Sequence, residues 1–225
     1  MERRIEQTQD GSYTLYVPSM DEHYHSVKGA LTESMHIFVQ TGLKAHPAAS
    51  PRVLEIGFGT GLNAFLTWME ADASRRVVRY TTLERYPVDE ALWRAMAYPQ
   101  HVAPERADDF ARLHRCGWDS EVALDPWFRF CKRQADVTAY PFPPSAYDVV
   151  YWDAFAPEKQ PEMWTRPLME QMYATLDEGG LLVTYCAKGA VRRLLQDVGF
   201  EVERLPGPPG GKREILRATK RTKRA

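Results

Sequence analysis

The order of apolar and polar residues follows a regular pattern from about residue 51 onward. Short runs rich in β-branched and aromatic residues, such as 147–152, alternate with longer stretches such as 61–71, in which apolar residues recur every three to four positions. The first pattern is typical of buried strands and the second of helices that pack on one face. Strands that alternate with helices predict an α/β fold with a mostly parallel sheet and helices on both faces.

The predicted elements follow one another without a linker or an internal repeat. Helices are expected over 61–71, 88–96, 106–115, 161–176 and 190–198, and strands over 53–57, 77–84, 147–152, 181–186, 200–205 and 214–218. Only a loop joins the last two strands, so they should pair antiparallel. A hairpin over 121–135 is expected as an insertion before the next sheet strand. The whole sheet is expected to have seven strands with an antiparallel hairpin at one edge.

The first 50 residues carry a different pattern. Two short strand-like segments, 3–8 and 13–17, flank a turn at Asp10-Gly11, which predicts a small β-hairpin. Helical spacing follows over 27–42. A length of 225 residues suits a single α/β domain. The chain is therefore expected to consist of an N-terminal extension, a main domain and a basic tail, with the boundaries 1–50, 51–219 and 220–225.

Composition and charge are those of an ordinary globular protein, with 44% hydrophobic residues, 26% charged residues and a formal net charge of −1. This balance shows no global basic signature for nucleic acid. From Lys212 to the end, however, seven residues are Lys or Arg and one is acidic. Such a segment is either a solvated chain end or a source of attraction to RNA phosphate, and the sequence leaves both open.

Three features bear on location and metal content. The chain has 3 cysteines, widely spaced and without a C-x-x-C pattern, which fits a reducing cytoplasm and disfavours structural zinc. The N-terminus lacks the apolar stretch of a signal peptide, and no run reaches the ~18 apolar residues of a membrane span. A cytoplasmic protein without membrane contact is expected. His23 and His25 lack a third ligand at metal spacing, so no metal is expected.

The most informative motif is Val-Leu-Glu-Ile-Gly-Phe-Gly-Thr-Gly at 53–61. Its glycines allow a sharp turn and a close approach of ligand to backbone, and a helix N-terminus follows. A dinucleotide fingerprint is G-x-G-x-x-G, whereas the third glycine comes one residue early in this run, and Glu55 would repel a pyrophosphate. The run resembles the first motif of class I methyltransferases and favours S-adenosylmethionine over a nicotinamide cofactor. A glycine-rich turn without a ligand is the remaining alternative.

Four acidic residues fall at predicted carboxyl ends of strands, where ligands bind in open α/β sheets. Glu55 is placed to pair with an α-amino group, and Glu84 to accept both ribose hydroxyls. Asp136 is placed to accept the adenine exocyclic amine, and Asp153 to face the reactive methyl. Each acid alone is as easily an N-cap or a solvated loop residue. Four acids at one edge of a sheet favour a binding site.

The run Asp-Ala-Phe-Ala-Pro at 153–157 is similar to the D/N-P-P-Y/F strand end of amino-group methyltransferases. There a polar side chain grips the amine and an aromatic ring stacks on a base. An alkylamine must be neutral to attack, although its pKa is about 10. Asp153 is therefore the expected catalytic residue, which orients the amine and accepts its proton. Phe155 is expected to stack on the substrate.

Blocks spread over residues 20–218 resemble the methyltransferase domain of MnmC-type enzymes, which make 5-methylaminomethyl-2-thiouridine at the wobble position of certain tRNAs. The most specific are D-A-F-A-P-E-K-Q-P-E-M-W at 153–164 and G-K-R-E-I-L at 211–216. Further blocks lie within 21–38, 54–68 and 189–200.

The resemblance implies a Rossmann-like class I methyltransferase fold. It also implies methyl transfer from S-adenosyl-L-methionine to the amine of 5-aminomethyl-(2-thio)uridine in a tRNA anticodon stem-loop. The cofactor's amino-acid end would lie near Tyr24, Ser26 and Glu33. The other implied cofactor contacts are Glu55, Gly57, Phe58, Gly59, Thr60, Gly61, Asn63, Glu84, Asp136 and Asp153.

RNA contacts are expected from basic residues on loops and helix starts at the same sheet edge, and from aromatic residues that stack on a splayed base. Arg192 and Arg193 are nearly as easily a solvated helix face. The expected residues are Lys159, Lys188, Arg192, Arg193, Lys212 and Arg213, with the aromatic residues Phe155 and Trp164.

Two-domain relatives of this type carry a flavin-dependent oxidase after the methyltransferase, and this sequence has no second glycine fingerprint. A stand-alone, monomeric methyltransferase is therefore expected, with a separate oxidase acting upstream. The alternatives are N-methylation of a small-molecule amine, polyamine synthesis with a decarboxylated cofactor, and a non-catalytic RNA-binding module on the same fold.

Overall fold

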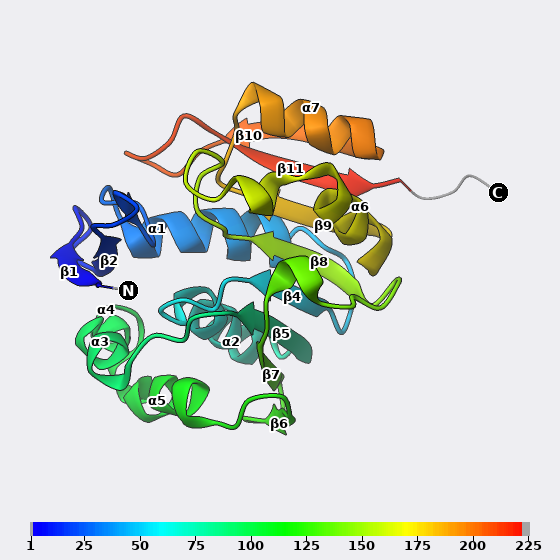
Figure 1. Ribbon diagram of the computed structural model, residues 1–225. Coiled ribbons are helices and arrows are strands. Elements are labelled where there is room, and N and C mark those ends of the chain that lie inside the picture. The colour runs from blue at the N-terminus through cyan, green and yellow to red at the C-terminus, as the bar shows by residue number, and fades with distance from the viewer. Residues whose placement is uncertain (1, 222–225) are drawn as a thin grey trace.

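The structure, a computed structural model, describes residues 2–221 and is built around an eight-stranded sheet in the order β10-β11-β9-β8-β4-β5-β7-β6 (Figure 1). The part of the basic tail beyond Arg221 lies outside the described residues. The strands are β4 (Arg52–Ile56), β5 (Val78–Glu84), β6 (Glu121–Ala123), β7 (Phe128–Gln134), β8 (Tyr147–Trp152), β9 (Leu176–Thr184), β10 (Phe200–Pro206) and β11 (Glu214–Lys220).

Strand pairing confirms the expected fold class. The five strands β9, β8, β4, β5 and β7 are parallel to one another, and β11 is antiparallel to both β9 and β10. The sheet nevertheless has eight strands instead of the expected seven. The hairpin at 121–135 is no insertion, because β7 pairs in parallel with β5 and β6 covers the outer edge of β7. Phe128 and Phe130 are fully buried in this central position.

Helices α2 (Leu62–Ser74), α5 (Ala107–Arg115) and α7 (Gly189–Val198) lie close to their expected ranges. The helix expected over 161–176 is divided at Thr165, which has extended backbone, into a 3-10 turn at Pro161–Trp164 and α6 at Arg166–Thr175. Strand β9 begins at Leu176, directly after α6 ends and before the expected start at 181. The other helices are α3 (Glu90–Ala95) and α4 (Tyr98–Val102), with further 3-10 turns at Pro104–Arg106 and Val137–Ala139.

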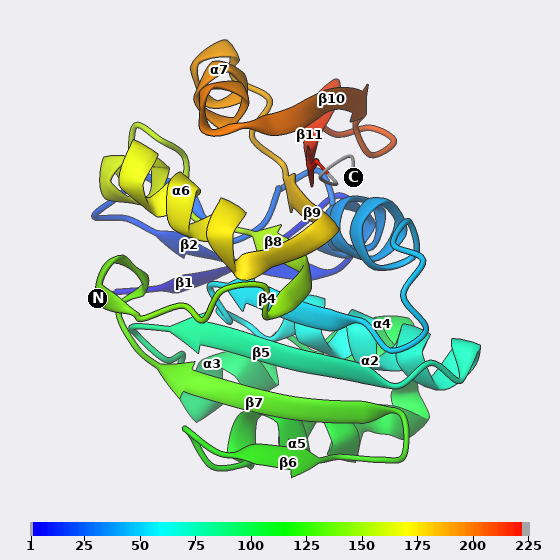
Figure 2. The same ribbon diagram turned by 90° about the vertical axis from the view of Figure 1, so that its right-hand side faces the viewer.

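Alternate residues of each central strand pack on opposite faces of the sheet, as the two-residue period of a strand requires. Tyr151 of β8 packs against Phe38 of the helical segment Met35–Leu43 and contacts Thr67 of α2. Val150 and Trp152 face the other side, in the cluster that includes α6 and α7. Figure 2 shows α2, α3 and α5 behind β5 and β7. Helices therefore cover both faces, as expected.

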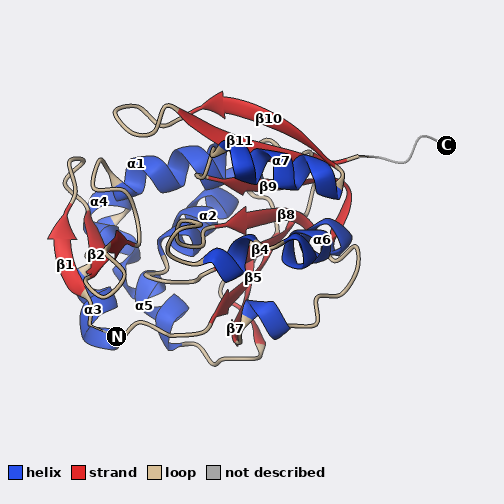
Figure 3. Ribbon diagram, turned by 45° about the horizontal axis from the view of Figure 1, so that its top comes forward, coloured by secondary structure: helices blue, strands red, loops and turns tan. Residues whose placement is uncertain are grey.

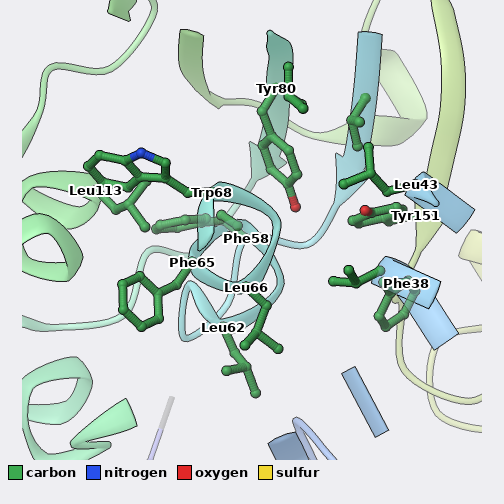
Figure 4. Packing of buried hydrophobic residues seen from close by; sticks show 14 of the residues in the cluster. Phe38, Leu43, Phe58, Leu62, Phe65, Leu66, Trp68, Tyr80, Leu113 and Tyr151 are labelled. Atoms are coloured by element: carbon green, nitrogen blue, oxygen red, sulfur yellow. The ribbon is translucent and has the colours of Figure 1, made fainter. Parts of the chain in front are cut away.

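Aromatic side chains fill the space between α2 and the sheet. Trp68 of α2 stacks on Phe128 of β7, with ring centroids 5.6 Å and planes 7° apart. Tyr80 and Tyr151 point from the sheet toward α2, whereas Phe65 lies on the side of the helix toward Leu113 (Figure 4). This packing fixes the first turn of α2, which follows the glycine-rich loop.

The N-terminal extension is larger than the expected hairpin. Strands β1 (Arg4–Gln7), β2 (Tyr13–Val17) and β3 (Glu22–His23) form a three-stranded antiparallel sheet. A helix follows as α1 (Ala30–Ser34), which continues as the π-helix η1 (Met35–Leu43). Figure 3 shows the small sheet beside α3 and α4 at one side of the molecule. The Tyr98 hydroxyl of α4 donates to Tyr13 O of β2 at 3.1 Å, which joins the extension to the main domain.

Candidate functional site

A cavity of about 310 Å³ opens at the edge of the sheet where the parallel strands β4, β5, β7 and β8 end. Three of the four acids expected at strand ends line it, namely Glu84, Asp136 and Asp153. The structure thus brings together most of the expected cofactor-binding residues. The others that line the cavity are Tyr24, Gly57, Phe58, Gly59 and Asn63.

The N–H groups of the three glycines in the glycine-rich loop are already used inside the protein. Gly57 N donates to Leu83 O at 2.9 Å, Gly59 N to Glu84 Oε2 at 2.9 Å, and Gly61 N to Phe58 O at 2.8 Å. A phosphate-binding loop directs free N–H groups at its ligand. This loop is therefore not built to hold a pyrophosphate, which agrees with the choice of cofactor made from the glycine spacing.

Gly59 is the point where the loop passes closest to the N-terminal extension. Its φ is +52°, and a Cβ added there would lie 3.0 Å from the ring of Tyr24. A side chain would be strained by the backbone angle and would also press on the ring that lines the cavity. The glycine is needed at this position for both reasons.

Glu84 ends β5 and holds its carboxylate at the cavity through two backbone contacts. Its Oε2 accepts from Gly59 N at 2.9 Å and its Oε1 from Tyr86 N at 2.7 Å. Each oxygen keeps a free lone pair, because a carboxylate oxygen can accept two hydrogen bonds. The fixed pair of acceptors suits the two adjacent hydroxyl donors of a ribose.

Asp136 follows β7 and is held by three donors. Its Oδ1 accepts from Thr138 N at 3.0 Å and Thr138 Oγ1 at 2.7 Å, and its Oδ2 pairs with Arg85 at 2.7 Å. The hydrogen bonds from Thr138, followed by the charge of Arg85, keep the pKa of Asp136 below its usual value. Asp136 therefore stays ionised, and the apolar side chains of Leu83 and Val137 line the cavity beside it.

Asp153 follows β8, and its environment differs from that of Asp136. It is only partly exposed, and its Oδ2 accepts from Asn63 Nδ2 at 2.8 Å. Burial raises the pKa of Asp153 to about 7, an increase that the Asn63 hydrogen bond opposes and the charge of Glu33 favours. A carboxylate that titrates near neutral pH is suited to accept a proton from a bound amine.

Glu55 does not line the cavity, although its side chain was expected to contact the cofactor directly. It is completely buried between the sheet and α2. Residues of a strand point alternately to opposite faces, and Glu55 faces the same side as Val53, toward α2. This position outside the cavity lining gives no support to the expected pairing of Glu55 with the cofactor ammonium.

Four other expected cofactor contacts lie outside the cavity lining, each in a structural role. Glu33 accepts from Ser26 N at 3.0 Å and pairs with Lys212 at 2.7 Å. Thr60 is buried and receives the Tyr98 hydroxyl at 3.0 Å. A Cβ on Gly61 would meet His114 Nε2 at 2.7 Å. The residues outside the lining are Ser26, Glu33, Thr60 and Gly61.

The expected RNA-contacting lysines each have an acidic partner. Lys159 lies 3.8 Å from Asp21 and lines the cavity, Lys188 pairs with Glu158, and Lys212 pairs with Glu33. Within residues 2–221, no ion pair involves Arg192, Arg193 or Arg213. Arg193 and Arg213 are exposed. These arginines remain the better candidates for contact with phosphate.

The two expected aromatic contacts have different positions. Phe155 lines the cavity, and its ring meets that of Tyr24 edge-on with centroids 5.3 Å apart. Trp164 is buried outside the lining, where its Nε1 donates to Phe155 O at 2.9 Å. Trp164 therefore supports the backbone of Phe155 and is not free to stack on a base.

Sequence reasoning missed several residues that line the cavity, among them Arg3, His25 and Tyr86. Arg3 donates to Tyr86 O at 2.8 Å, which joins the first strand to the loop after β5. This contact spans more than 80 residues, and no local pattern in the sequence announces it. Tyr86 could have been predicted, because it follows the expected ribose-binding residue Glu84 by two positions and therefore lies near the same ligand.

The lining fits S-adenosyl-L-methionine. Glu84 supplies acceptors for a diol, apolar side chains flank Asp136, and Asp153 supplies a carboxylate toward the positive end of the ligand. Across residues 2–221, no group of His, Cys, Asp and Glu side chains is placed to bind a metal. All three cysteines are free. None of the helices in the described part of the chain is long and apolar enough to cross a membrane.

Curated proteins and solved structures resemble this chain over most of its length. The protein named tRNA 5-methylaminomethyl-2-thiouridine biosynthesis bifunctional protein MnmC is 32% identical in Idiomarina loihiensis, over 88% of this chain and 35% of the relative. The same-named protein of Delftia acidovorans is 31% identical over 93% of this chain and 34% of the relative. The chain thus spans about a third of the length of these relatives.

Solved structures agree with the sequence comparison. MNMC2 from Aquifex aeolicus aligns with a TM-score of 0.74 and 26% identity, over 97% of this chain and 70% of that chain. Spermidine synthase from Thermotoga maritima, at 18% identity and a TM-score of 0.59, shares the fold over 97% of this chain and 69% of its own.

A family profile described as S-adenosyl-L-methionine-dependent methyltransferase matches residues 101–221, which is more than half of the chain. The match includes β7, β8 and the residues Asp136 and Asp153 that line the cavity. Together with the cavity and its glycine-rich loop, this match shows that the chain belongs to the S-adenosyl-L-methionine-dependent methyltransferase family.

Proposed function

We propose that the protein transfers a methyl group from S-adenosyl-L-methionine to the amine of 5-aminomethyl-(2-thio)uridine at the wobble position of tRNA. The product is 5-methylaminomethyl-(2-thio)uridine. The names of the relatives support this substrate, since they describe biosynthesis of that nucleoside. The likeness to MNMC2 from Aquifex aeolicus adds structural support.

The observation that carries the proposal is the position and chemistry of Asp153. It lines the cavity beside Phe155, Asn63 holds it at 2.8 Å, and its pKa is raised to about 7 by burial. An amine that attacks a methyl group must first lose a proton, and a base near neutral pKa accepts one without trapping it.

The cofactor supplies a methyl group on a positively charged sulfur atom. The protein's part is to align the amine nitrogen with that methyl group and to exclude water, since displacement at carbon depends on proximity and direction. Asp153 accepts a proton at a carboxylate oxygen from the ammonium form of the amine, which leaves the nitrogen neutral for attack. Phe155 and Tyr24 form the aromatic wall beside Asp153 against which a uracil ring can lie.

We further propose Tyr24, Gly57, Phe58, Gly59, Asn63, Glu84, Asp136 and Asp153 as the cofactor-contacting set. Each lines the cavity. Exposed Arg193 and Arg213, with Lys159 at the cavity, are proposed to contact the anticodon stem-loop, where phosphate contacts position the RNA and base contacts select it. The substrate itself requires an earlier reaction that leaves a primary amine, which we propose is the work of an oxidase.

The test is transfer of radiolabelled methyl groups to bulk tRNA from cells that lack this modification. Nucleosides from the labelled tRNA are then separated and their masses measured. Label in 5-methylaminomethyl-(2-thio)uridine is the expected result, and it should disappear with Asp153→Ala although the variant still binds S-adenosylhomocysteine in calorimetry.

Label in free polyamines or other small amines, with none in tRNA, would instead assign a small-molecule N-methyltransferase. Rising salt distinguishes the two substrates independently. Binding to a tRNA releases counterions, so the KM for tRNA should rise steeply with salt, whereas that for a small amine should not. Binding of S-adenosylmethionine without label in any acceptor would favour a non-catalytic module.

A further inference from the structure

Between the sheet and α2, beside the cavity, lies a group of buried polar side chains, of which the proposed reaction uses only Asn63. Glu55 of β4 and Thr82 of β5 are 0% exposed, Tyr80 of β5 is 1% exposed, and Asn63 of α2 is 2% exposed. We call these four residues the buried polar layer. Both oxygens of Glu55, Asn63 Oδ1, Tyr80 Oη and Thr82 Oγ1 have no hydrogen-bond partner within the described structure.

Within residues 2–221, no Lys, Arg or His side chain forms an ion pair with Glu55. The titratable groups that act on it are Tyr80 from β5, Tyr151 from β8 and Asp153 from the end of β8. From α2 it meets the amide of Asn63. An ionised carboxylate buried without a cation is costly, because desolvation of the charge is not compensated. The neutral acid avoids this cost.

Counting hydrogen atoms in the buried polar layer leads to the same answer. Five oxygen atoms lack partners, and the hydroxyls of Tyr80 and Thr82 supply only two donors for them. A carboxylate at Glu55 supplies no donor, whereas a protonated carboxyl group supplies a third. Buried polar groups are expected to be paired, so the protonated acid is the form that best satisfies this group of atoms.

The layer touches the reaction centre through one residue. Asn63 approaches Glu55 closely enough to influence its proton affinity, and its Nδ2 donates to Asp153 Oδ2 at 2.8 Å. Asn63 thus lies between two acids, one buried and one in the cavity. An unfavourable contact on the Glu55 side would move the amide that holds Asp153.

We propose that Glu55 carries a proton in the working enzyme and acts as a positioning residue. As a neutral acid it holds the Asn63 amide, which in turn holds Asp153, and it adds no further negative charge beside Asp153. The kinetic part of this proposal rests on the proposed function, in which Asp153 accepts the amine proton. The protonation of Glu55 does not depend on the substrate.

The proton affinity of the group agrees with this assignment. Burial raises the pKa of Glu55 to about 8, and the charge of Asp153 raises it as well, whereas Thr82, Tyr80 and Asn63 oppose the increase. The cavity residue Asp153 has a pKa of about 7. At neutral pH the buried acid therefore keeps its proton while a substantial fraction of Asp153 is ionised.

The first experiment measures the protonation of Glu55 in the whole protein. Infrared difference spectra between wild type and Glu55→Gln should contain a carboxylic-acid carbonyl band at pH 7. The folded protein binds a proton on Glu55 between the unfolded pKa of about 4.3 and the folded value. The unfolding free energy of wild type should therefore fall, relative to Glu55→Gln, as pH rises from about 5 to about 8.

The second experiment measures binding and turnover. Glu55→Gln keeps a neutral side chain of the same shape, so its Kd for S-adenosylhomocysteine should match wild type and its kcat should stay within about threefold. Glu55→Ala leaves Asn63 unsupported, and its kcat should fall by more than about tenfold with little change in KM. Thr67→Val is the matched control. It removes a buried hydroxyl from α2 that contacts Tyr151 at 3.2 Å, so it should lower stability without changing the pH profile of kcat.

Two outcomes would overturn the proposal. Weakening of S-adenosylhomocysteine binding by more than about tenfold in Glu55→Gln would show that an ionised Glu55 pairs with the ammonium group. Absence of the carboxylic-acid band, with equal pH dependence of stability in both proteins, would show that Glu55 is ionised. Failure of wild type to methylate tRNA would refute the proposed function alone, because the infrared, stability and binding measurements still decide the state of Glu55.

Discussion

Asp136 and Asp153 line the same cavity, but their surroundings give them opposite proton affinities. Asp136 is held by hydrogen bonds from Thr138 and by Arg85, which lower its pKa. Asp153 is only partly exposed and has one amide donor, and desolvation raises its pKa to about 7. When the pKa values of two carboxyl groups in one site differ in this way, the group with the raised pKa is the candidate for proton transfer. Asp136 is then left with a binding role.

Replacement of Asp153 by asparagine should lower kcat for methyl transfer by about 100-fold or more, because the amine loses its proton acceptor. The pH dependence gives the more specific test. Activity of wild type should rise with pH through about 7, as Asp153 becomes ionised, and level off above that value. The rise should be absent in Asp153→Asn.

Asp136→Asn is the control for that experiment, since the substitution should weaken cofactor binding and leave the rise in activity near pH 7 in place. A wild-type profile that is flat between pH 6 and pH 8 would contradict the assignment of Asp153 as the base. Both measurements need steady-state rates at saturating cofactor over a range of pH.

Glu84→Gln should weaken cofactor binding by about tenfold, or ~1.4 kcal/mol. The amide offers one acceptor atom where the carboxylate offers two, so the contacts with Gly59 N at 2.9 Å and Tyr86 N at 2.7 Å cannot both be kept along with a ribose diol. Calorimetry with S-adenosylhomocysteine measures the loss. An unchanged Kd would show that the ribose lies elsewhere.

The difference between Glu84 and Glu55 shows how far single residues can be placed from sequence. Both acids were expected at strand ends, and the chain order of strands was sufficient to bring Glu84, Asp136 and Asp153 to one cavity. The sequence did not show, however, toward which face of the sheet each side chain points. Glu55 lies one residue before the end of β4 and faces α2, so it is buried under the site.

At the scale of elements, the turn before α2 is held by contacts from two other parts of the chain. His114 of α5 donates through Nε2 to Thr60 O at 3.1 Å, and His25 of the N-terminal extension contacts Thr60 Oγ1 at 3.2 Å. Burial lowers the pKa of His25 to about 4, and burial with the charge of Lys132 lowers that of His114 to about 3. Both histidines are therefore neutral in the folded protein.

These neutral histidines predict a loss of stability in acid. Below about pH 6.5 the unfolded chain takes up protons on His25 and His114 that the folded protein does not bind. The unfolding free energy should therefore fall as pH decreases from about 6.5 to about 4. His114→Gln removes one of the two buried rings, so the fall in unfolding free energy should be shallower. Its amide can still donate to Thr60 O, which preserves this contact. Urea denaturation at pH 7 and pH 5 measures the difference.

His101→Gln is the comparison for that measurement, because His101 is exposed on α4. It should show the same acid dependence as wild type. Equal slopes in wild type, His101→Gln and His114→Gln would contradict the assignment of the acid sensitivity to the buried ring.

The loop itself should not tolerate a side chain at Gly61. Its φ is +77°, and a Cβ would lie 2.7 Å from His114 Nε2, so Gly61→Ala combines backbone strain with a clash. We expect a destabilisation of about 2–4 kcal/mol from both effects. Gly11→Ala is the matched control, because Gly11 has a φ of +84° but no atom within 4 Å of the added Cβ. It should cost about 1 kcal/mol.

Element types were predictable from sequence where a pattern was strong, and element partners were not. The helix at 62–74 and the strand at 147–152 follow the expected periodicity. The run at 128–134 was read with its neighbour as a local hairpin, because sequence shows the adjacent turn and not the distant strand β5 that pairs with β7 in parallel. The division near Thr165 depends on a local backbone angle that a period of apolar residues does not reveal.

At the scale of the whole molecule, the N-terminal extension connects distant parts of the chain around the cavity. Arg3 donates to Tyr86 O at 2.8 Å, and Glu33 pairs with Lys212 at 2.7 Å. The mostly parallel sheet, the two covered faces and the place of the cavity followed from the βα alternation. These links did not, because each depends on residues more than 80 positions apart whose contact leaves no local signal.

If tRNA is the substrate, removal of one phosphate contact should reduce the salt dependence of binding by about one unit of log KM per unit of log salt. Arg193→Ala and Arg213→Ala remove exposed charges and should each give such a reduction. Lys44→Ala is the control, because Lys44 precedes β4 at the opposite edge of the sheet and pairs with Glu70 at 3.0 Å. An unchanged slope in both arginine variants would place the RNA on another surface.

The internally used N–H groups of the glycine-rich loop have a consequence for selectivity among the nucleotides of the cell. ATP and NAD share adenosine with S-adenosylmethionine and are abundant, yet their phosphates would find no unused backbone donor on Gly57, Gly59 or Gly61. A phosphate placed at one of these glycines would have to displace a hydrogen bond inside the protein. Excess ATP should therefore be a weak competitor of S-adenosylmethionine.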